Sequence, residues 1–86
     1  MIILSVNAGS SSLKFTGFEM PSEDVLISGV FERIGIDNSF YTIKVNGEKI
    51  KKEVELPNHK VAFEILIKEL MDNKIVESLD EIKGVG

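Results

Sequence analysis

The chain has 86 residues, of which 43% are hydrophobic and 28% charged, so its composition is that of one small globular domain rather than of a disordered segment. A formal net charge of −4 argues against a general nucleic-acid-binding surface. Cysteine is absent, so we expect no disulfides. No apolar run approaches the roughly 20 residues that span a bilayer, and residues 1–4 lack the basic start of a signal peptide. We therefore expect a cytoplasmic protein without a membrane anchor.

The first predicted elements are two β-strands joined by a loop of small residues. Residues 2–6 are apolar on both faces, which is typical of a strand buried on both sides, and residues 13–18 have the β-prone side chains of a hairpin partner. Between them, residues 7–12 include only Asn, Ala, Gly and Ser, and a lysine follows. Such a loop has free backbone N–H groups and can wrap an anion such as phosphate. The alternative is that Gly and Ser merely form a tight turn.

The loop supplies the candidate phosphate-binding residues. Backbone amides and hydroxyls of Ser10, Ser11 and Ser12 are expected to point at the β- and γ-phosphates of a nucleotide. Gly9 would let the backbone approach, and Lys14 would add positive charge. Because the lysine follows the serines and lies on a strand instead of opening a helix, the pattern is not the G-x-x-x-x-G-K-[ST] P-loop.

Asn7 stands where the first strand gives way to this loop. Its side-chain carbonyl is a possible ligand for a hydrated Mg²⁺, which keeps several waters and takes few protein ligands. The alternative is an Asx-turn residue.

A turn and a third strand follow. Pro, Ser and Asp in residues 20–24 are typical of a turn, and residues 25–31 read as a strand in which Gly29 marks a possible bulge. Residues 34–39 are a polar connection.

A second hairpin is predicted at Asn46-Gly47, the strongest short hairpin signal, between strands of residues 40–45 and 48–56. A two-residue turn would set Lys44 opposite Lys49, which is unfavourable, so a longer loop with a bulge is the alternative.

A single amphipathic helix is predicted over residues 59–72, after Pro57 ends the strand and with Asn58 as N-cap. Charges of alternating sign recur every four residues on a solvent-facing stripe: Lys60, Glu64, Lys68 and Asp72. The opposite face should pack on the sheet through Ala62, Phe63, Leu66, Ile67, Leu70 and Met71. Residues 73–82 form a polar connection, with a turn around 78–81, that leads to a last short strand.

The remaining polar residues predict no catalytic group. His59 is the only histidine, and beside a helix N-cap, without a second ligand or a nucleophile nearby, it is interpreted as structural. Glu32 and Arg33 are also interpreted as structural, and the other carboxylates form no plausible acid/base couple.

Residues 6–15, Val-Asn-Ala-Gly-Ser-Ser-Ser-Leu-Lys-Phe, resemble the N-terminal signature of acetate kinases. The similarity continues through residues 32–35, 56–60 and 84–86, in order and in register from Met1, and so covers essentially the whole chain. The resemblance implies an α/β fold, with an α+β mixed sheet. This would be the N-terminal part of an actin-like, ribonuclease H-like ATPase domain, with antiparallel strands, a hairpin insertion and one packed helix. Residues 1–86 would then be the N-terminal portion of the first acetate kinase domain, with the rest of that domain and the second domain absent.

The resemblance also implies a function. The full-length enzyme would transfer a phosphoryl group reversibly, with Mg²⁺, between ATP and acetate, giving acetyl phosphate and ADP. Ser10, Ser12 and Lys14 match the family's ATP-binding loop, and Asn7 matches a magnesium-site residue. Catalytic residues and a homodimer interface would lie beyond Gly86, so this chain alone is expected to be inactive. A propionate or other short-chain carboxylate kinase and a non-catalytic α+β module are the alternatives.

Overall fold

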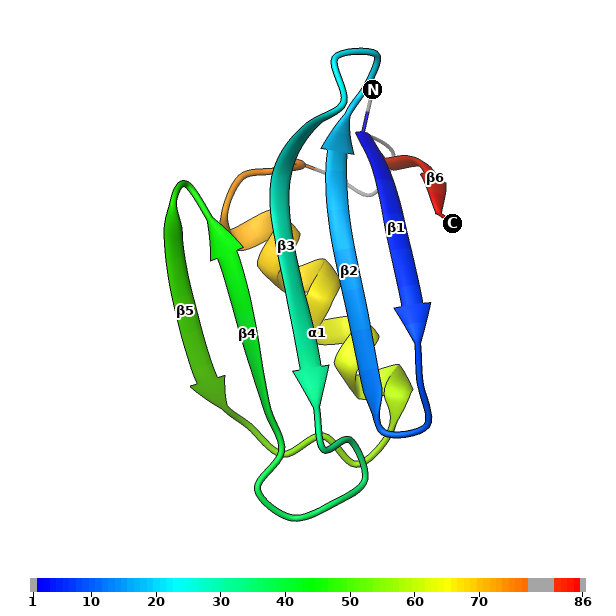
Figure 1. The fold of residues 1–86 in the computed structure, drawn as a ribbon, viewed down its shortest axis with the longest axis vertical. Coiled ribbons are helices and arrows are strands. Elements are labelled where there is room, and N and C mark those ends of the chain that lie inside the picture. The colour runs from blue at the N-terminus through cyan, green and yellow to red at the C-terminus, as the bar shows by residue number, and fades with distance from the viewer. Residues whose placement is uncertain (1, 78–81, 86) are drawn as a thin grey trace.

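The structure is a computed structural model that describes residues 2–77 and 82–85. Its strands form one sheet in the order β5-β4-β3-β2-β1-β6, and helix α1 runs diagonally across one face, behind the strands in Figure 1. The elements are β1 (Ile2–Ala8), β2 (Ser12–Glu19), β3 (Asp24–Glu32), β4 (Phe40–Val45), β5 (Glu48–Glu53), α1 (His59–Asp72) and β6 (Ile82–Val85).

The sheet is mixed, as expected. Strands β1 to β5 pair antiparallel with their sequence neighbours, whereas β6 returns to the open edge of β1 and pairs with it in parallel. The last strand begins at Ile82, earlier than the sequence analysis indicated. The turn expected around residues 78–81 lies outside the described residues.

The second hairpin has the two-residue turn and not the longer loop. Asn46 and Gly47 both have positive φ, 54° and 77°, which is the backbone that this turn requires. Lys44 does lie opposite Lys49. Both lysines are exposed, so water and salt screen their repulsion. Strand β5 ends at Glu53, short of the expected residue 56.

The bulge expected at Gly29 was wrong. The register of β2 against β3 shifts between Gly17 and Phe18 instead, and Gly29 pairs regularly with Phe15. A Cβ at Gly29 would lie 2.6 Å from Cε1 of Phe15 and 2.7 Å from the carbonyl oxygen of Thr42. Glycine is therefore needed here because the Phe15 ring lies over the backbone.

The hydrophobic core lies between the sheet and α1. The rings of Phe15, Phe31 and Tyr41 cross three neighbouring strands, with centroids 6.0 Å apart for the first pair and 4.9 Å for the second. Leu66 and Leu70 of α1 are fully buried against this face.

Two expectations about burial were wrong. Phe63 and Met71, expected on the packed face of α1, are 37% and 44% exposed, whereas Glu69 is buried there. Strand β1 is not buried on both sides: Leu4 faces the helix, but its neighbour Ser5 is exposed. Within the described residues α1 covers only one face, so the alternate side chains of β1 remain accessible.

Candidate phosphate-binding site

The candidate site is the bend between β1 and β2, formed by residues 9–11. The N–H of Gly9 donates to the carbonyl oxygen of Ser12 at 2.8 Å and closes the bend. A Cβ at Gly9 would lie 2.7 Å from the hydroxyl oxygen of Ser12. Gly9 therefore makes room for that hydroxyl, and its expected role in letting the backbone approach a phosphate stays a prediction.

The carbonyl oxygens of Gly9, Ser11 and Ser12 are held by other parts of the protein. That of Ser11 accepts the N–H of Ile34 at 2.9 Å, and His59 Nε2 lies 2.7 Å from that of Gly9 and 3.2 Å from that of Ser12. In contrast, no acceptor among the described residues takes the N–H groups of Ser10 and Ser11. The bend therefore turns the carbonyls of Gly9 and Ser11 toward the protein and leaves two backbone donors open, as an anion site requires.

Asn7 and Lys14 lie directly opposite each other on β1 and β2. Side chains at such positions have Cβ atoms about 4.5–5.5 Å apart and share a face of the sheet. Both residues are exposed, and they alternate with Leu13 and Phe15, which face α1, so they lie on the face away from the helix. Ser12 precedes Lys14 by two residues and is on the same face. The structure thus gathers all of the sequence-predicted site residues at one end of one hairpin.

The surroundings of Asn7 suit a weakly held metal ion. An Asx turn would need a hydrogen bond from the Asn7 side chain, but this side chain makes none to the described residues. No three His, Cys, Asp or Glu residues come together in the described part of the chain. An exposed amide oxygen fits Mg²⁺, which is held largely by water and substrate phosphates, better than a metal that needs a full set of protein ligands.

Sequence reasoning missed two residues that shape the site. His59 was interpreted as structural, and Ile34 was given no role at the bend, yet both bond the bend from distant segments. His59 lies 50 positions from Gly9 in the sequence, so no local pattern could have paired them. Arg33, expected to be structural, donates from Nε to the carbonyl oxygen of Asp37 at 2.8 Å.

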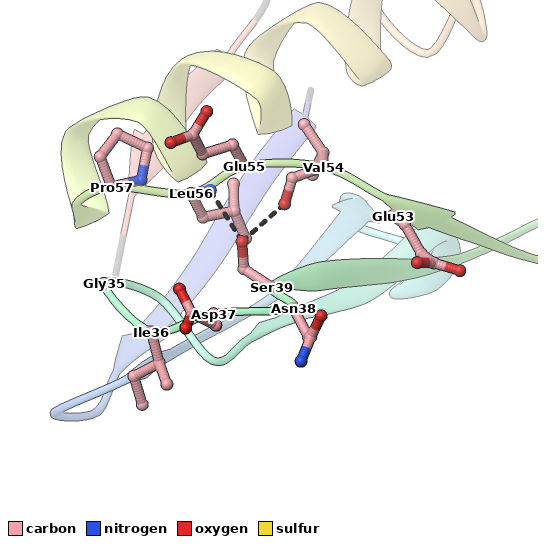
Figure 2. Close-up of a pocket in the computed structure, with 10 residues that line it drawn as sticks. All are labelled: Gly35, Ile36, Asp37, Asn38, Ser39, Glu53, Val54, Glu55, Leu56 and Pro57. Atoms are coloured by element: carbon pink, nitrogen blue, oxygen red, sulfur yellow. Dashed lines mark hydrogen bonds between the residues drawn. The ribbon is translucent and has the colours of Figure 1, made fainter.

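A groove of about 640 Å³ lies elsewhere, between residues 35–39 and 53–57 (Figure 2). The hydroxyl of Ser39 donates to the carbonyl of Val54 at 2.6 Å and accepts the N–H of Leu56 at 2.8 Å. The lining also includes the acidic residues Asp37, Glu53 and Glu55. Carboxylates repel phosphate and the serine is already satisfied, so this groove does not compete with the bend as a phosphate site.

A buried carboxylate lies toward the other end of α1. Glu69 accepts hydrogen bonds from the Tyr41 hydroxyl and, at 3.1 Å, from Lys52 Nζ, while Asn73 Nδ2 donates to its other oxygen at 3.2 Å. Burial by itself raises the pKa of Glu69, but these hydrogen bonds outweigh it and hold the pKa below its ordinary value. Burial and the bond to Glu69 raise the pKa of Tyr41. This cluster ties α1 to β4 and β5 and is structural.

Within residues 2–77 and 82–85, no helix combines the length and apolar character required to cross a lipid bilayer. A mixed sheet with one packed helix, whose first hairpin is joined by a bend of small residues, defines the class of protein: an α/β domain.

Comparison with known proteins gives the family. The sequence profile of the Acetokinase family matches residues 2–86. Over 84 residues the chain is 58% identical to an acetate kinase of Bacillus mycoides and 56% identical to one of a Geobacillus species, matches that cover 98% of this chain. The chain belongs to the acetokinase family, and it spans about a fifth of the length of these relatives, 21% in each case.

Solved structures agree. The crystal structure of an acetate kinase from Porphyromonas gingivalis is similar to 99% of this chain with a TM-score of 0.92 and 40% identity, over 22% of its own length. A propionate kinase from Francisella tularensis is similar over 99% of this chain and 21% of its own, with a TM-score of 0.85 and 33% identity. The expected fold is thereby confirmed.

Proposed function

We propose that the whole protein is an acetate kinase, which transfers a phosphoryl group reversibly between ATP and acetate and yields ADP and acetyl phosphate. This chain contributes the bend that holds the phosphates. The observation that carries the proposal is the pairing of Asn7 with Lys14 beside a bend whose Ser10 and Ser11 amides are open. Acetate kinases among the relatives support the choice of substrate.

Each residue of the bend has a role in binding the nucleotide. The amides and hydroxyls of Ser10, Ser11 and Ser12 bind phosphate oxygens, with Gly9 leaving room for the last hydroxyl. The Lys14 ammonium neutralises phosphate charge, and Asn7 holds Mg²⁺, in part through water. When bound, the ion would offset the charge that develops on the phosphates.

We expect the other functional residues of the enzyme in the part of the full-length protein that this chain does not include. Phosphoryl transfer depends on positioning and on cationic groups around the γ-phosphate, and the described residues form no acid/base or arginine cluster at the bend. We therefore expect catalytic residues, the acetate pocket and a homodimer interface outside these 86 residues, and no turnover by this chain alone. Without cysteine, the chain is suited to the reducing cytoplasm, where we expect the enzyme to work.

Propionate is the alternative acceptor. The propionate kinase of Francisella tularensis shares this fold at 33% identity, below the 58% shared with an acetate kinase. Competition between acetate and propionate in the full-length protein separates the two.

The test is acetyl phosphate formation by the full-length protein, trapped as the hydroxamate, with Lys14→Ala. Loss of a charge-assisted contact worth about 1.5–3 kcal/mol should lower kcat/KM for Mg·ATP roughly ten- to a hundredfold. Lys44→Ala, which removes an exposed lysine from β4, is the matched control and should match the wild type. Unchanged kinetics in Lys14→Ala would refute the assignment. Mg·ATP binding without acetyl phosphate would favour the non-catalytic module, and turnover by the 86-residue chain would contradict its expected inactivity.

A further inference from the structure

We infer that His59 is a positioning residue for the phosphate bend. Its Nε2–H holds the Gly9 carbonyl on the protein side and thereby directs the next backbone N–H toward the phosphates. This inference rests on the proposed function, because it assigns His59 a part in binding the nucleotide through that bend.

The contact has the geometry of a shared donor. His59 Nε2 lies 2.7 Å from the carbonyl oxygen of Gly9 and 3.2 Å from that of Ser12. Carbonyl oxygens only accept hydrogen bonds, so Nε2 must bear the proton. One ring nitrogen then holds both sides of the bend from the first residue of α1.

The peptide plane links this contact to the ligand side. The carbonyl of Gly9 and the N–H of Ser10 belong to one planar trans peptide and point in opposite directions. Holding the carbonyl against His59 therefore turns the Ser10 N–H away from the protein, where no described acceptor takes it. Ile34 N–H holds a second carbonyl of the bend, that of Ser11, on the protein side in the same way.

Without His59, the peptide after Gly9 is free to rotate, because glycine tolerates backbone conformations that other residues do not. A rotated peptide would present its carbonyl oxygen to the phosphates and repel them. The backbone of His59 is itself held in place, since the preceding residue, Asn58, caps α1 by accepting the N–H of Val61 at 3.0 Å. His59 is thus held at the helix start while its ring reaches the bend.

The experiment compares His59→Ala and His59→Gln in the full-length protein. Gln places an amide N–H donor near the position of Nε2, whereas Ala removes the donor. We expect the KM for Mg·ATP to rise about tenfold in His59→Ala, the equivalent of one hydrogen bond, and to return to within about threefold of wild type in His59→Gln. The KM for acetate should not change, and Mg·ADP affinity measured by calorimetry should follow the KM for Mg·ATP.

The control separates positioning from stability. Leu66→Val trims a fully buried side chain of α1 away from the bend, and it should lower the thermal midpoint without changing the KM for Mg·ATP. If Leu66→Val raises this KM as much as His59→Ala does, or if Gln gives no rescue, the inference is wrong.

The outcomes also separate this inference from the proposed function. A wild type that forms acetyl phosphate, with unchanged nucleotide affinity in His59→Ala, overturns the role of His59 alone. A wild type that forms none, but whose Mg·ADP affinity falls in His59→Ala and recovers in His59→Gln, overturns the acetate kinase proposal alone. A full-length protein that binds neither nucleotide overturns both.

Discussion

The buried carboxylate of Glu69 offers the sharpest test of what holds α1 on the sheet. Tyr41→Phe removes the hydroxyl that donates to Glu69 and leaves the ring stacked on Phe31. A hydrogen bond to a charged group contributes about 1.5–3 kcal/mol. Lys52 and Asn73 still donate to Glu69 in this variant, so we expect a loss near the lower end, about 1.5 kcal/mol.

The assay is amide hydrogen exchange of α1 in the full-length protein, which reports the local free energy of opening. Exchange in the helix should accelerate about tenfold in Tyr41→Phe. Phe40→Leu, a change on the neighbouring residue that removes no hydrogen bond to Glu69, is the control. Unchanged exchange in Tyr41→Phe would refute the assigned role of the hydroxyl.

The same cluster predicts an acid dependence. The pKa of Glu69 is below its ordinary value of 4.5 in the folded protein, so its ionisation stabilises the fold above that value, and this contribution is lost as the pH falls through the lower, folded pKa. The stability difference between the wild type and Glu69→Gln should therefore shrink on acidification below about pH 4.5. A difference that stays constant from pH 6 to pH 3 would contradict the assignment.

Two further predictions concern packing and capping. Gly29→Ala should destabilise the fold by about 1–3 kcal/mol, because its Cβ would clash with the Phe15 ring and the Thr42 carbonyl. Ser28→Ala is the control, since Gly47→Ala would add strain at a residue with positive φ. Equal thermal midpoints for Gly29→Ala and Ser28→Ala would rule the clash out. Asn58→Ala should lower the stability of α1 by about 1 kcal/mol through loss of the N-cap, and Asn58→Asp should restore that stability. Amide hydrogen exchange of α1 measures both effects, and unchanged exchange in Asn58→Ala would contradict the cap.

Short-range features were predictable because their causes are local. Pro57, Asn58 and the apolar period predicted a helix over residues 59–72, and the structure has the same bounds. Asn46-Gly47 predicted a hairpin, although like charges at its end raised the alternative of a longer loop that the structure does not adopt. The bend between β1 and β2 was evident from its run of small residues.

Features that depend on distant partners were not predictable in this way. Glu69 resembles any helix glutamate until Tyr41 and Lys52 arrive from two other strands to satisfy its charge. Gly29 suggested a bulge, because nothing local shows that the Phe15 ring occupies the place of its side chain.

The amino-acid sequence by itself determined the strands, the helix and the chemical character of the bend, since turn residues, caps and periodicity act within a few positions. Tertiary structure alone decided that β6 joins β1 in parallel, that Asn7 faces away from the helix, and that His59 holds the bend from 50 residues away. The physical reason is that a backbone carbonyl turns toward the hydrogen-bond donor that the folded chain places beside it. For the bend this donor is His59, at the start of the helix that packs on the face of the sheet opposite Asn7 (Figure 1).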